Sequence, residues 1–210
     1  MTVLFEAQLR SPHPAPYVQH KFLVELFAQV TNTPLVPGIT AIRDYVWCES
    51  DGVLFIRRTN PTNDLAWHPV EIPPADSLIN FEVLARCRSN MGELRPNHWR
   101  RPHPIFRRGA RSPMTDPNDN LTWFCDRAEK LGLEVVDAGV ELDMKTIGKE
   151  NRSRRNQQRP AFSLLVANFY GVAKVCDPVL FERALAVGVG DGKAFGLGFI
   201  FFWQRGLNNA

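Results

Sequence analysis

Residues 177–204 read DPVLFERALAVGVGDGKAFGLGFIFFWQ and join three local patterns in one run. Asp177 and the proline after it are typical of a helix start, because aspartate caps free backbone N–H groups and proline suits the first helical position. The apolar spacing that follows predicts a helix, and LGFIFFWQ (197–204) predicts a buried strand. Between them, GVGDGKAFGLG (188–198) has five glycines in eleven residues. A helix that turns through glycines into an apolar strand indicates a mixed α and β fold.

The glycine-rich turn carries a lysine and could therefore hold a phosphate. A P-loop, G-x-x-x-x-G-K-[ST], does not fit, because the spacing from Gly188 to Gly192 is one residue short and Ala194 replaces the magnesium-binding hydroxyl. The Rossmann spacing G-x-G-x-x-G is also absent. We therefore expect no nucleotide cofactor. A tight turn explains some of the glycines, and the symmetric placing of the others around Lys193 predicts backbone that a polymer can approach closely.

The rest of the chain predicts two units with the order strand, helix, strand, strand, helix, strand. In the first unit a proline-rich stretch replaces the second helix, and the expected elements are strand 2–9, helix Tyr17–Val30, strands 41–50 and 52–58, and strand 79–89. In the second unit they are a short strand within 108–114, helix 116–132 and strands 133–144 and 161–175, followed by the helix and strand quoted above. The sequence therefore predicts an α+β protein of two tandem ferredoxin-like (RRM-like) βαββαβ domains, residues 1–92 and 93–210.

The composition fits a soluble protein with a real core, at 44% apolar and 22% charged residues. No apolar stretch approaches the ~20 residues needed to span a bilayer, and the start of the chain lacks the pattern of a signal peptide. The four cysteines are scattered, without a C-x-x-C pair, which favours reduced thiols over a zinc site or disulfides. We expect a cytoplasmic protein without a membrane or metal partner.

The basic residues are concentrated in two runs. Residues 86–111 hold eight arginines and one acid, and residues 145–159 hold six cations and one acid. Together the runs carry 14 of the 25 basic residues and 2 of the 22 acidic ones. Like charges gathered in this way repel one another unless a polyanion offsets the repulsion. Because arginine grips phosphate with two hydrogen bonds, a nucleic-acid backbone is a better interpretation than two solvated loops.

One histidine differs from the others in its setting. His20 lies on the predicted helix 17–30, and Tyr17 lies one turn earlier on a neighbouring part of the helix surface. Both fall off the apolar stripe of the helix, so a buried core histidine is the weaker explanation. Histidine titrates near neutral pH and can transfer protons. A functional His–Tyr pair and a structural role both remain open at this point, and a Ser-His-Asp hydrolase is not supported because no G-x-S-x-G motif is present.

The helix start PYVQH (16–20), the arginine-rich centre and the terminal glycine motif together resemble one family. They are similar to the type I-E CRISPR repeat endoribonuclease, the CasE-type subunit of the Cascade surveillance complex. That family has Y-x-x-H at a helix start and a closing G-h-G-x-x-K-x-x-G-h-G motif, where h is hydrophobic. The matching residues in this chain are Tyr17, His20, Gly188, Gly190, Lys193, Gly196 and Gly198. The resemblance covers essentially the whole chain and departs at Glu25, where some members have a lysine.

The resemblance implies an enzyme that cuts precursor CRISPR RNA at the base of the repeat hairpin without a metal ion. It implies attack by a 2′-hydroxyl, giving a 2′,3′-cyclic phosphate and a 5′-hydroxyl, with His20 as general base or acid and Tyr17 supporting it. The protein would then stay on the mature guide RNA, with other Cascade subunits as partners. The expected RNA-binding residues are Lys21, Arg95, Arg100, Arg101, Arg107, Arg108, Arg152, Arg154, Arg155, Arg159, Gly188, Gly190, Lys193, Gly196 and Gly198.

Two alternatives remain open from the residues alone. The first is a catalytically inactive subunit that binds an RNA hairpin within a ribonucleoprotein complex. The second is a DNA-binding or general single-strand-binding protein, which would show little preference for hairpin RNA.

Overall fold

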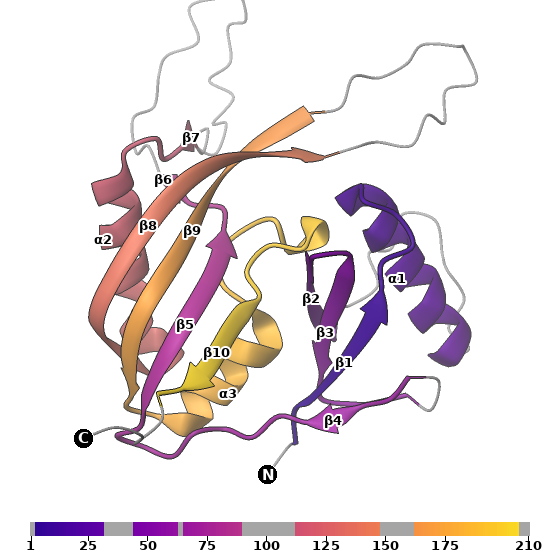
Figure 1. Ribbon diagram of the computed structural model, residues 1–210, viewed down its shortest axis with the longest axis horizontal. Coiled ribbons are helices and arrows are strands. Elements are labelled where there is room, and N and C mark those ends of the chain that lie inside the picture. The colour runs from indigo at the N-terminus through magenta and orange to yellow at the C-terminus, as the bar shows by residue number, and fades with distance from the viewer. Residues whose placement is uncertain (1–2, 32–43, 63–64, 90–111, 148–161, 206–210) are drawn as a thin grey trace, which may run out of the picture.

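The computed structural model of the 210-residue chain describes residues 3–31, 44–62, 65–89, 112–147 and 162–205. It contains two four-stranded antiparallel sheets that face each other (Figure 1). The first sheet has the order β2-β3-β1-β4 and is built from β1 (Phe5–Arg10), β2 (Tyr45–Ser50), β3 (Val53–Arg58) and β4 (His68–Pro69). Asp51 and Gly52 join β2 to β3 with positive φ angles (51° and 76°), as a two-residue hairpin turn requires.

One helix, α1 (Pro16–Thr31), covers the first sheet. Its apolar face is formed by Leu23 and Phe27, which pack into a cluster with Tyr45, Trp47, Leu54 and Ile56. The predicted helix Tyr17–Val30 is therefore confirmed, with Pro16 at its first position. The described residues between β3 and β4 contain no helix, which agrees with the predicted loss of the second helix in this unit.

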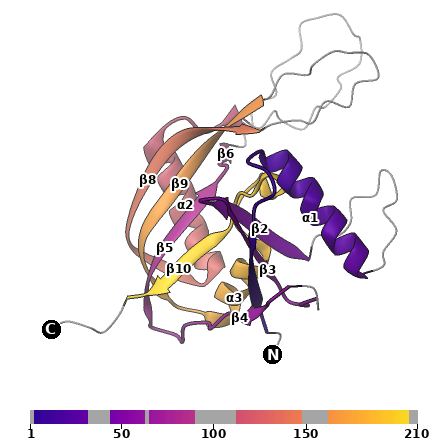
Figure 2. The same ribbon diagram turned by 45° about the vertical axis from the view of Figure 1, so that its right-hand side comes forward.

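The second sheet has the order β10-β5-β9-β8 and carries two helices on one face. Its elements are β5 (Leu78–Ala85), α2 (Pro117–Ala128), η1 (Glu129–Leu131), β8 (Leu133–Ile147), β9 (Phe162–Val175), α3 (Pro178–Val187), η2 (Lys193–Phe195) and β10 (Ile200–Gln204). The core contains a stack of aromatic rings, with 5.3 Å between the centroids of Phe81 and Phe124 and 4.7 Å between those of Phe124 and Phe169. Figure 2 shows β8 and β9 as long curved strands that extend beyond β5 and β10.

Aspartates cap the two helices of the second unit. Asp116 Oδ1 accepts hydrogen bonds from the amides of Asn118 and Asp119, and Asp177 Oδ1 accepts them from Val179 and Leu180. A proline follows each aspartate, as the sequence predicts. Gly132, with a φ of 75°, ends the first of these helical segments. No helix in the described ranges is long and apolar enough to cross a membrane.

The sheets divide the chain at a different point from the predicted boundary at residues 92 and 93. The strand expected to close the first unit, β5, pairs with β9 and β10 and opens the second sheet. The first sheet is closed instead by β4, which has two residues and pairs with β1. The short strand expected within 108–114 is β7 (Ser112–Pro113), which pairs with β6 (Arg88–Ser89) in a separate two-stranded ladder. Both units therefore keep the ferredoxin-like strand order, with the division between β4 and β5.

A buried arginine ties the two sheets together. Arg57 of β3 is 3% exposed, and its Nε donates to Glu6 Oε2 at 2.8 Å. Its Nη1 donates to the carbonyl oxygen of Ile200 in β10, and its guanidinium lies 4.1 Å from the centre of the Phe199 ring. These contacts satisfy a charge that would otherwise be costly to bury. They fix the first sheet against the last strand of the second.

Candidate functional site

A buried glutamine holds the start of α1. Gln19 is 0% exposed, and its Nε2 donates to Ser11 Oγ at 3.0 Å and to the His13 carbonyl oxygen at 2.7 Å. The amide of Ala15 donates to His13 Nδ1 at 2.9 Å. These bonds fix the loop between β1 and α1. The start of α1, which carries both predicted catalytic side chains, therefore has a defined position.

The predicted catalytic pair lies where α1 meets the second unit. Tyr17 is half-buried and packs, as does Phe195 of η2, against a buried apolar cluster of Ile147, Leu164, Val166 and Leu197. His20 follows one turn later, half-buried, with its Nδ1 atom buried. The helix itself contacts η2, which is part of the glycine-rich loop. The fold thus brings the two motifs together from opposite ends of the sequence.

The glycine-rich loop (residues 188–198) is shaped mainly by packing. Gly196 and Gly198 are buried, with φ angles of 71° and 84°. A Cβ atom on Gly198 would lie 2.1 Å from the carbonyl oxygen of Val189, and one on Gly196 would lie 2.9 Å from Trp47 Cζ3. The loop is also closed by backbone bonds from Val189 to Gly198 and from Gly198 to Leu84. Burial gives Gly196 and Gly198 a role in the fold, and their predicted contact with RNA stays a prediction.

The same applies to Gly188, which ends α3. Its Cβ position would lie 2.7 Å from the Gly198 carbonyl oxygen and 2.9 Å from Val46 Cγ2. Gly190 and Lys193 differ, because they line a pocket together with Arg86 and Arg88. Within the loop, residues 190–195 line this pocket, and the predicted contacts of the loop with RNA stay predictions.

That pocket is cationic and has a volume of about 410 Å³. It is lined by Arg86 and Arg88 on one side and by residues 190–195 on the other. Lys193 Nζ donates to the Gly190 carbonyl oxygen at 2.8 Å, and Arg88 Nε lies 3.5 Å from Asp191 Oδ2. Burial and the neighbouring Arg88 both lower the pKa of Arg86, and Asp191 partly opposes them. Arg86 and Arg88 were counted in the first basic run but not assigned to a site. Arg86 and Arg88 flank the buried Cys87, and side chains two residues apart in extended chain point to the same side. This spacing is the feature of the sequence that could have paired them.

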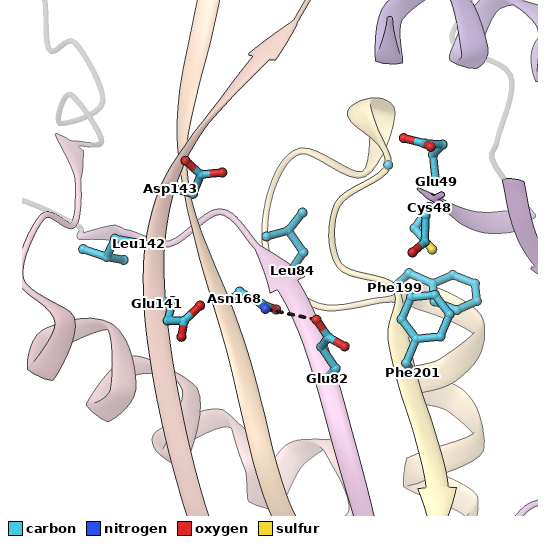
Figure 3. Close-up of a pocket in the computed structure, with 12 residues that line it drawn as sticks. Cys48, Glu49, Glu82, Leu84, Glu141, Leu142, Asp143, Asn168, Phe199 and Phe201 are labelled. Carbon is cyan, nitrogen blue, oxygen red and sulfur yellow. Dashed lines mark hydrogen bonds between the residues drawn. The ribbon is translucent and has the colours of Figure 1, made fainter. Parts of the chain in front are cut away.

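A second cavity, of about 500 Å³, lies between the two sheets and is acidic. Figure 3 shows four carboxylates around it, with Phe199 and Phe201 on the β10 side; they belong to Glu49, Glu82, Glu141 and Asp143. Glu82 Oε1 accepts a hydrogen bond from Asn168 Nδ2 at 3.0 Å. Within the described ranges no three His, Cys, Asp or Glu side chains are grouped so that they could hold a metal ion. A phosphate backbone is repelled by such a surface.

Two lysines bear on the charge of this region, Lys21 on α1 and Lys145 on β8. Lys21 Nζ is 3.8 Å from Glu25 Oε1, so the departure from the family pattern at Glu25 places an acid beside the nearest cation of the helix. Lys145 of β8 lies opposite Leu164 in the β8–β9 ladder, and Leu164 belongs to the cluster that packs against Tyr17. Burial lowers the pKa of Lys145, and Glu49 and Cys48 oppose this. The sequence analysis counted Lys145 only as part of the second basic run.

The remaining predicted RNA-binding residues lie outside the described ranges. They are Arg95, Arg100, Arg101, Arg107, Arg108, Arg152, Arg154, Arg155 and Arg159. Arg152, Arg154, Arg155 and Arg159 fall in the sequence between β8 and β9, the two strands of the predicted hairpin. Their contacts with RNA stay predictions.

A family of proteins described as "CRISPR associated protein" matches this chain over residues 49–202. The match spans most of the second unit and reaches back into β2 of the first. The chain belongs to this family. The resemblance drawn from Tyr17, His20 and the glycine motif is therefore confirmed at the level of the family. No curated protein matches the sequence.

Solved structures of CRISPR proteins share the fold over nearly their whole length. The CRISPR endoribonuclease Cse3 bound to a 19-nucleotide RNA is 16% identical, with 97% of this chain and 99% of that chain covered and a TM-score of 0.68. Cas6e from Escherichia coli K-12 is 13% identical, with 94% and 98% covered and a TM-score of 0.61. A chain of a CRISPR RNA-guided surveillance complex is 13% identical, with 95% and 99% covered and a TM-score of 0.56. At these identities the likeness establishes the fold, and it confirms two tandem ferredoxin-like units.

Proposed function

We propose that this protein is an endoribonuclease that cuts precursor CRISPR RNA at the base of the repeat hairpin. The observation that carries the proposal is the contact between α1, which carries Tyr17 and His20, and the glycine-rich loop, whose Lys193 lines a cationic pocket. Membership of the CRISPR associated protein family and a fold shared with the RNA-bound endoribonuclease Cse3 support it.

The proposed reaction is a transesterification within the RNA. The 2′-hydroxyl upstream of the scissile phosphate loses its proton and attacks phosphorus, while the 5′-oxygen of the next nucleotide leaves and takes up a proton. The products are a 2′,3′-cyclic phosphate and a 5′-hydroxyl. The nucleophile and the leaving group both belong to the RNA, so the protein needs only to position them and move protons, and no metal ion is required.

In this reaction His20 transfers a proton and Tyr17 supports it. A positioned proton-transfer group contributes about 10²–10⁴-fold in rate. Tyr17 is fixed by packing against Ile147 and Leu164, so its hydroxyl has a defined position near the helix start. The attacked phosphate gains negative charge in the transition state, which nearby cations stabilise. On the helix, Glu25 partly neutralises the positive charge of Lys21. Lys193 of the adjacent loop therefore supplies positive charge for the transition state.

The proposed partner is hairpin RNA, held by the two arginine-rich runs. Proteins grip an RNA duplex through phosphates, shape and 2′-hydroxyls, because its major groove is too deep and narrow to read. The acidic cavity between the sheets disfavours RNA on that face, so the RNA runs along the cationic side, past Arg86 and Arg88. After cleavage the protein remains on the mature guide RNA as a subunit of a Cascade-type complex in the cytoplasm. The fold shared with a chain of a surveillance complex supports this assembly.

Incubation of the protein with CRISPR repeat RNA in EDTA tests the proposal. One cut at the hairpin base, with a cyclic phosphate on the upstream product, supports it. A second candidate function is a catalytically inactive hairpin-binding subunit, which the Lys21–Glu25 pair at the helix start favours. Tight hairpin binding with unchanged RNA length after long incubation would decide for this alternative. Equal affinity for hairpin RNA and for DNA would favour a general nucleic-acid-binding protein instead.

A further inference from the structure

The cationic pocket is assembled from two segments that are distant in the sequence. Arg86 forms an isolated β-bridge with Asp191, and the Asp191 amide donates to the Arg86 carbonyl oxygen at 3.4 Å. Arg88 lies two residues further along, beyond the buried Cys87, and therefore on the same side of the chain. The opposite wall is the loop from Gly190 to Phe195. The arginine side chains and the loop thus enclose one space.

The charges that line this pocket are unbalanced. Of the described residues that line it, three are cations, Arg86, Arg88 and Lys193, and one is a carboxylate, Asp191. Among the described residues, the buried Nε of Arg86 has no hydrogen-bond partner. The closeness of Arg88 also lowers the pKa of Arg86. Like charges held together around an unused donor are unfavourable unless an anion lies between them.

We propose that this pocket binds one backbone phosphate of the RNA strand that is being cut, with Arg86 and Arg88 as the residues that grip it. Guanidinium groups match a phosphate through paired hydrogen bonds, and Lys193 adds a point charge from the loop. The inference rests on the proposed function, since it takes the bound strand to be the RNA substrate.

The place of the pocket determines which phosphate it binds. One segment, η2, forms a wall of the pocket and also contacts α1, and Phe195 of η2 packs on the same cluster as Tyr17. A phosphate in the pocket would therefore lie against the same segment that contacts α1. It is a neighbour of the scissile phosphate rather than a phosphate of the hairpin stem. Binding there would fix the strand on one side of the cut.

The test measures how tightly the variants Arg86→Gln and Arg88→Gln bind a repeat RNA. The RNA has a 2′-deoxy nucleotide upstream of the cut, so that it cannot be cleaved. The matched control is Arg183→Gln, which removes an exposed arginine on α3 outside the pocket. We expect each pocket variant to bind about 10-fold more weakly. We also expect the slope of log affinity against log salt to fall by about 1. The control should change neither quantity beyond a small general effect.

A second series locates the phosphate. RNAs that carry a single neutral methylphosphonate at successive positions near the cut are bound by the wild type and by Arg86→Gln. At one position next to the cut, the substitution should weaken wild-type binding and leave Arg86→Gln unaffected, because the two changes remove the same interaction. Additive losses at every position would overturn the inference.

The outcomes separate this inference from the proposed function. If the wild type binds and cuts repeat RNA but Arg86→Gln and Arg88→Gln bind it as tightly as Arg183→Gln does, the phosphate-binding role of the pocket is contradicted. The proposed function would then stand. A wild type that binds no repeat RNA would overturn both. Thermal unfolding of the variants excludes misfolding as the cause of a loss, and Arg86→Lys, which keeps the charge and loses the paired geometry, should fall between wild type and Arg86→Gln.

Discussion

Gly196 of the glycine-rich loop packs directly against the indole ring of Trp47 in the first sheet. A Cβ atom at Gly196 would lie 2.9 Å from Trp47 Cζ3 and 3.2 Å from Cη2. Trp47 is 1% exposed and part of the core under α1, so the ring cannot move aside. The glycine therefore sets how closely the loop approaches the unit that carries Tyr17 and His20. The glycine motif therefore helps to position the candidate site in addition to lining the cationic pocket.

Gly196→Ala should reduce the free energy of unfolding by about 2–5 kcal/mol, because left-handed strain adds to overlap with a fixed ring. Gly52→Ala is the matched control, since Gly52 has a φ of 76° with no atom within 4 Å of its Cβ position. It should lose only about 1–2 kcal/mol, from the strain alone. Urea unfolding of both variants measures the difference. Equal losses would mean that the contact with Trp47 does not restrict the loop.

His20→Ala should slow RNA cleavage about 10²–10⁴-fold, the usual contribution of a proton-transfer group. Hairpin affinity should stay within a few-fold of wild type. Tyr17→Phe keeps the ring on Ile147 and removes the hydroxyl, so it should slow cleavage while leaving the unfolding temperature unchanged. His68→Ala, an exposed histidine of β4, is the control and should cut normally. Parallel loss of binding and cleavage in His20→Ala would instead assign His20 a structural role.

Lys145→Met should raise stability near neutral pH, because burial lowers the pKa of Lys145 more than Glu49 and Cys48 raise it. In wild type, Lys145 therefore keeps its proton to a higher pH in the unfolded chain than in the folded chain. Wild-type stability should therefore rise with pH once the folded pKa of Lys145 is passed, up to its ordinary value. Urea unfolding from about pH 7 to about pH 10 should show this rise relative to Lys145→Met. A constant difference between the two proteins would contradict the effect of burial.

The four cysteines should fall into two classes of reactivity. Cys125 and Cys176 are exposed, whereas Cys48 and Cys87 are buried. Burial raises the pKa of the Cys87 thiol to about 12 and also raises that of Cys48, so both stay protonated at neutral pH. Ellman's reagent should modify two thiols rapidly in the native protein and all four in denaturant. Cys125→Ser should leave one rapid thiol, and four rapid thiols in the native protein would show that the core opens readily.

Local signals predicted the elements better than their partners. The aspartate–proline pairs at Asp116 and Asp177 start helices as expected, and the predicted bounds of α1 differ by one residue at each end. The assignment of β5 failed because its alternating pattern suits a strand in either sheet, and the true closing strand, His68–Pro69, is too short to leave a pattern. Pairing between strands is a long-range property that periodicity does not contain.

The candidate site could be proposed from the sequence where its residues are close together in the chain. Tyr17 and His20 share a helix, and their spacing marked them as a pair. The pocket was not predictable, because Arg86 meets Asp191 only after the second sheet and its last loop have formed. The packing role of Gly196 was hidden for the same reason, since it depends on Trp47 in the other unit. Glycine spacing alone did not distinguish an approach by RNA from an approach by a neighbouring ring.

The most direct test of the proposed function is cleavage of a CRISPR repeat RNA by the purified wild-type protein in excess EDTA. Denaturing electrophoresis and analysis of the product ends give the result. The proposal predicts a single cut at the base of the hairpin, with a 2′,3′-cyclic phosphate upstream and a 5′-hydroxyl downstream, and no cut in an RNA with a 2′-deoxy nucleotide before the scissile phosphate. Intact RNA after long incubation, or cleavage that appears only when magnesium is added, would contradict it.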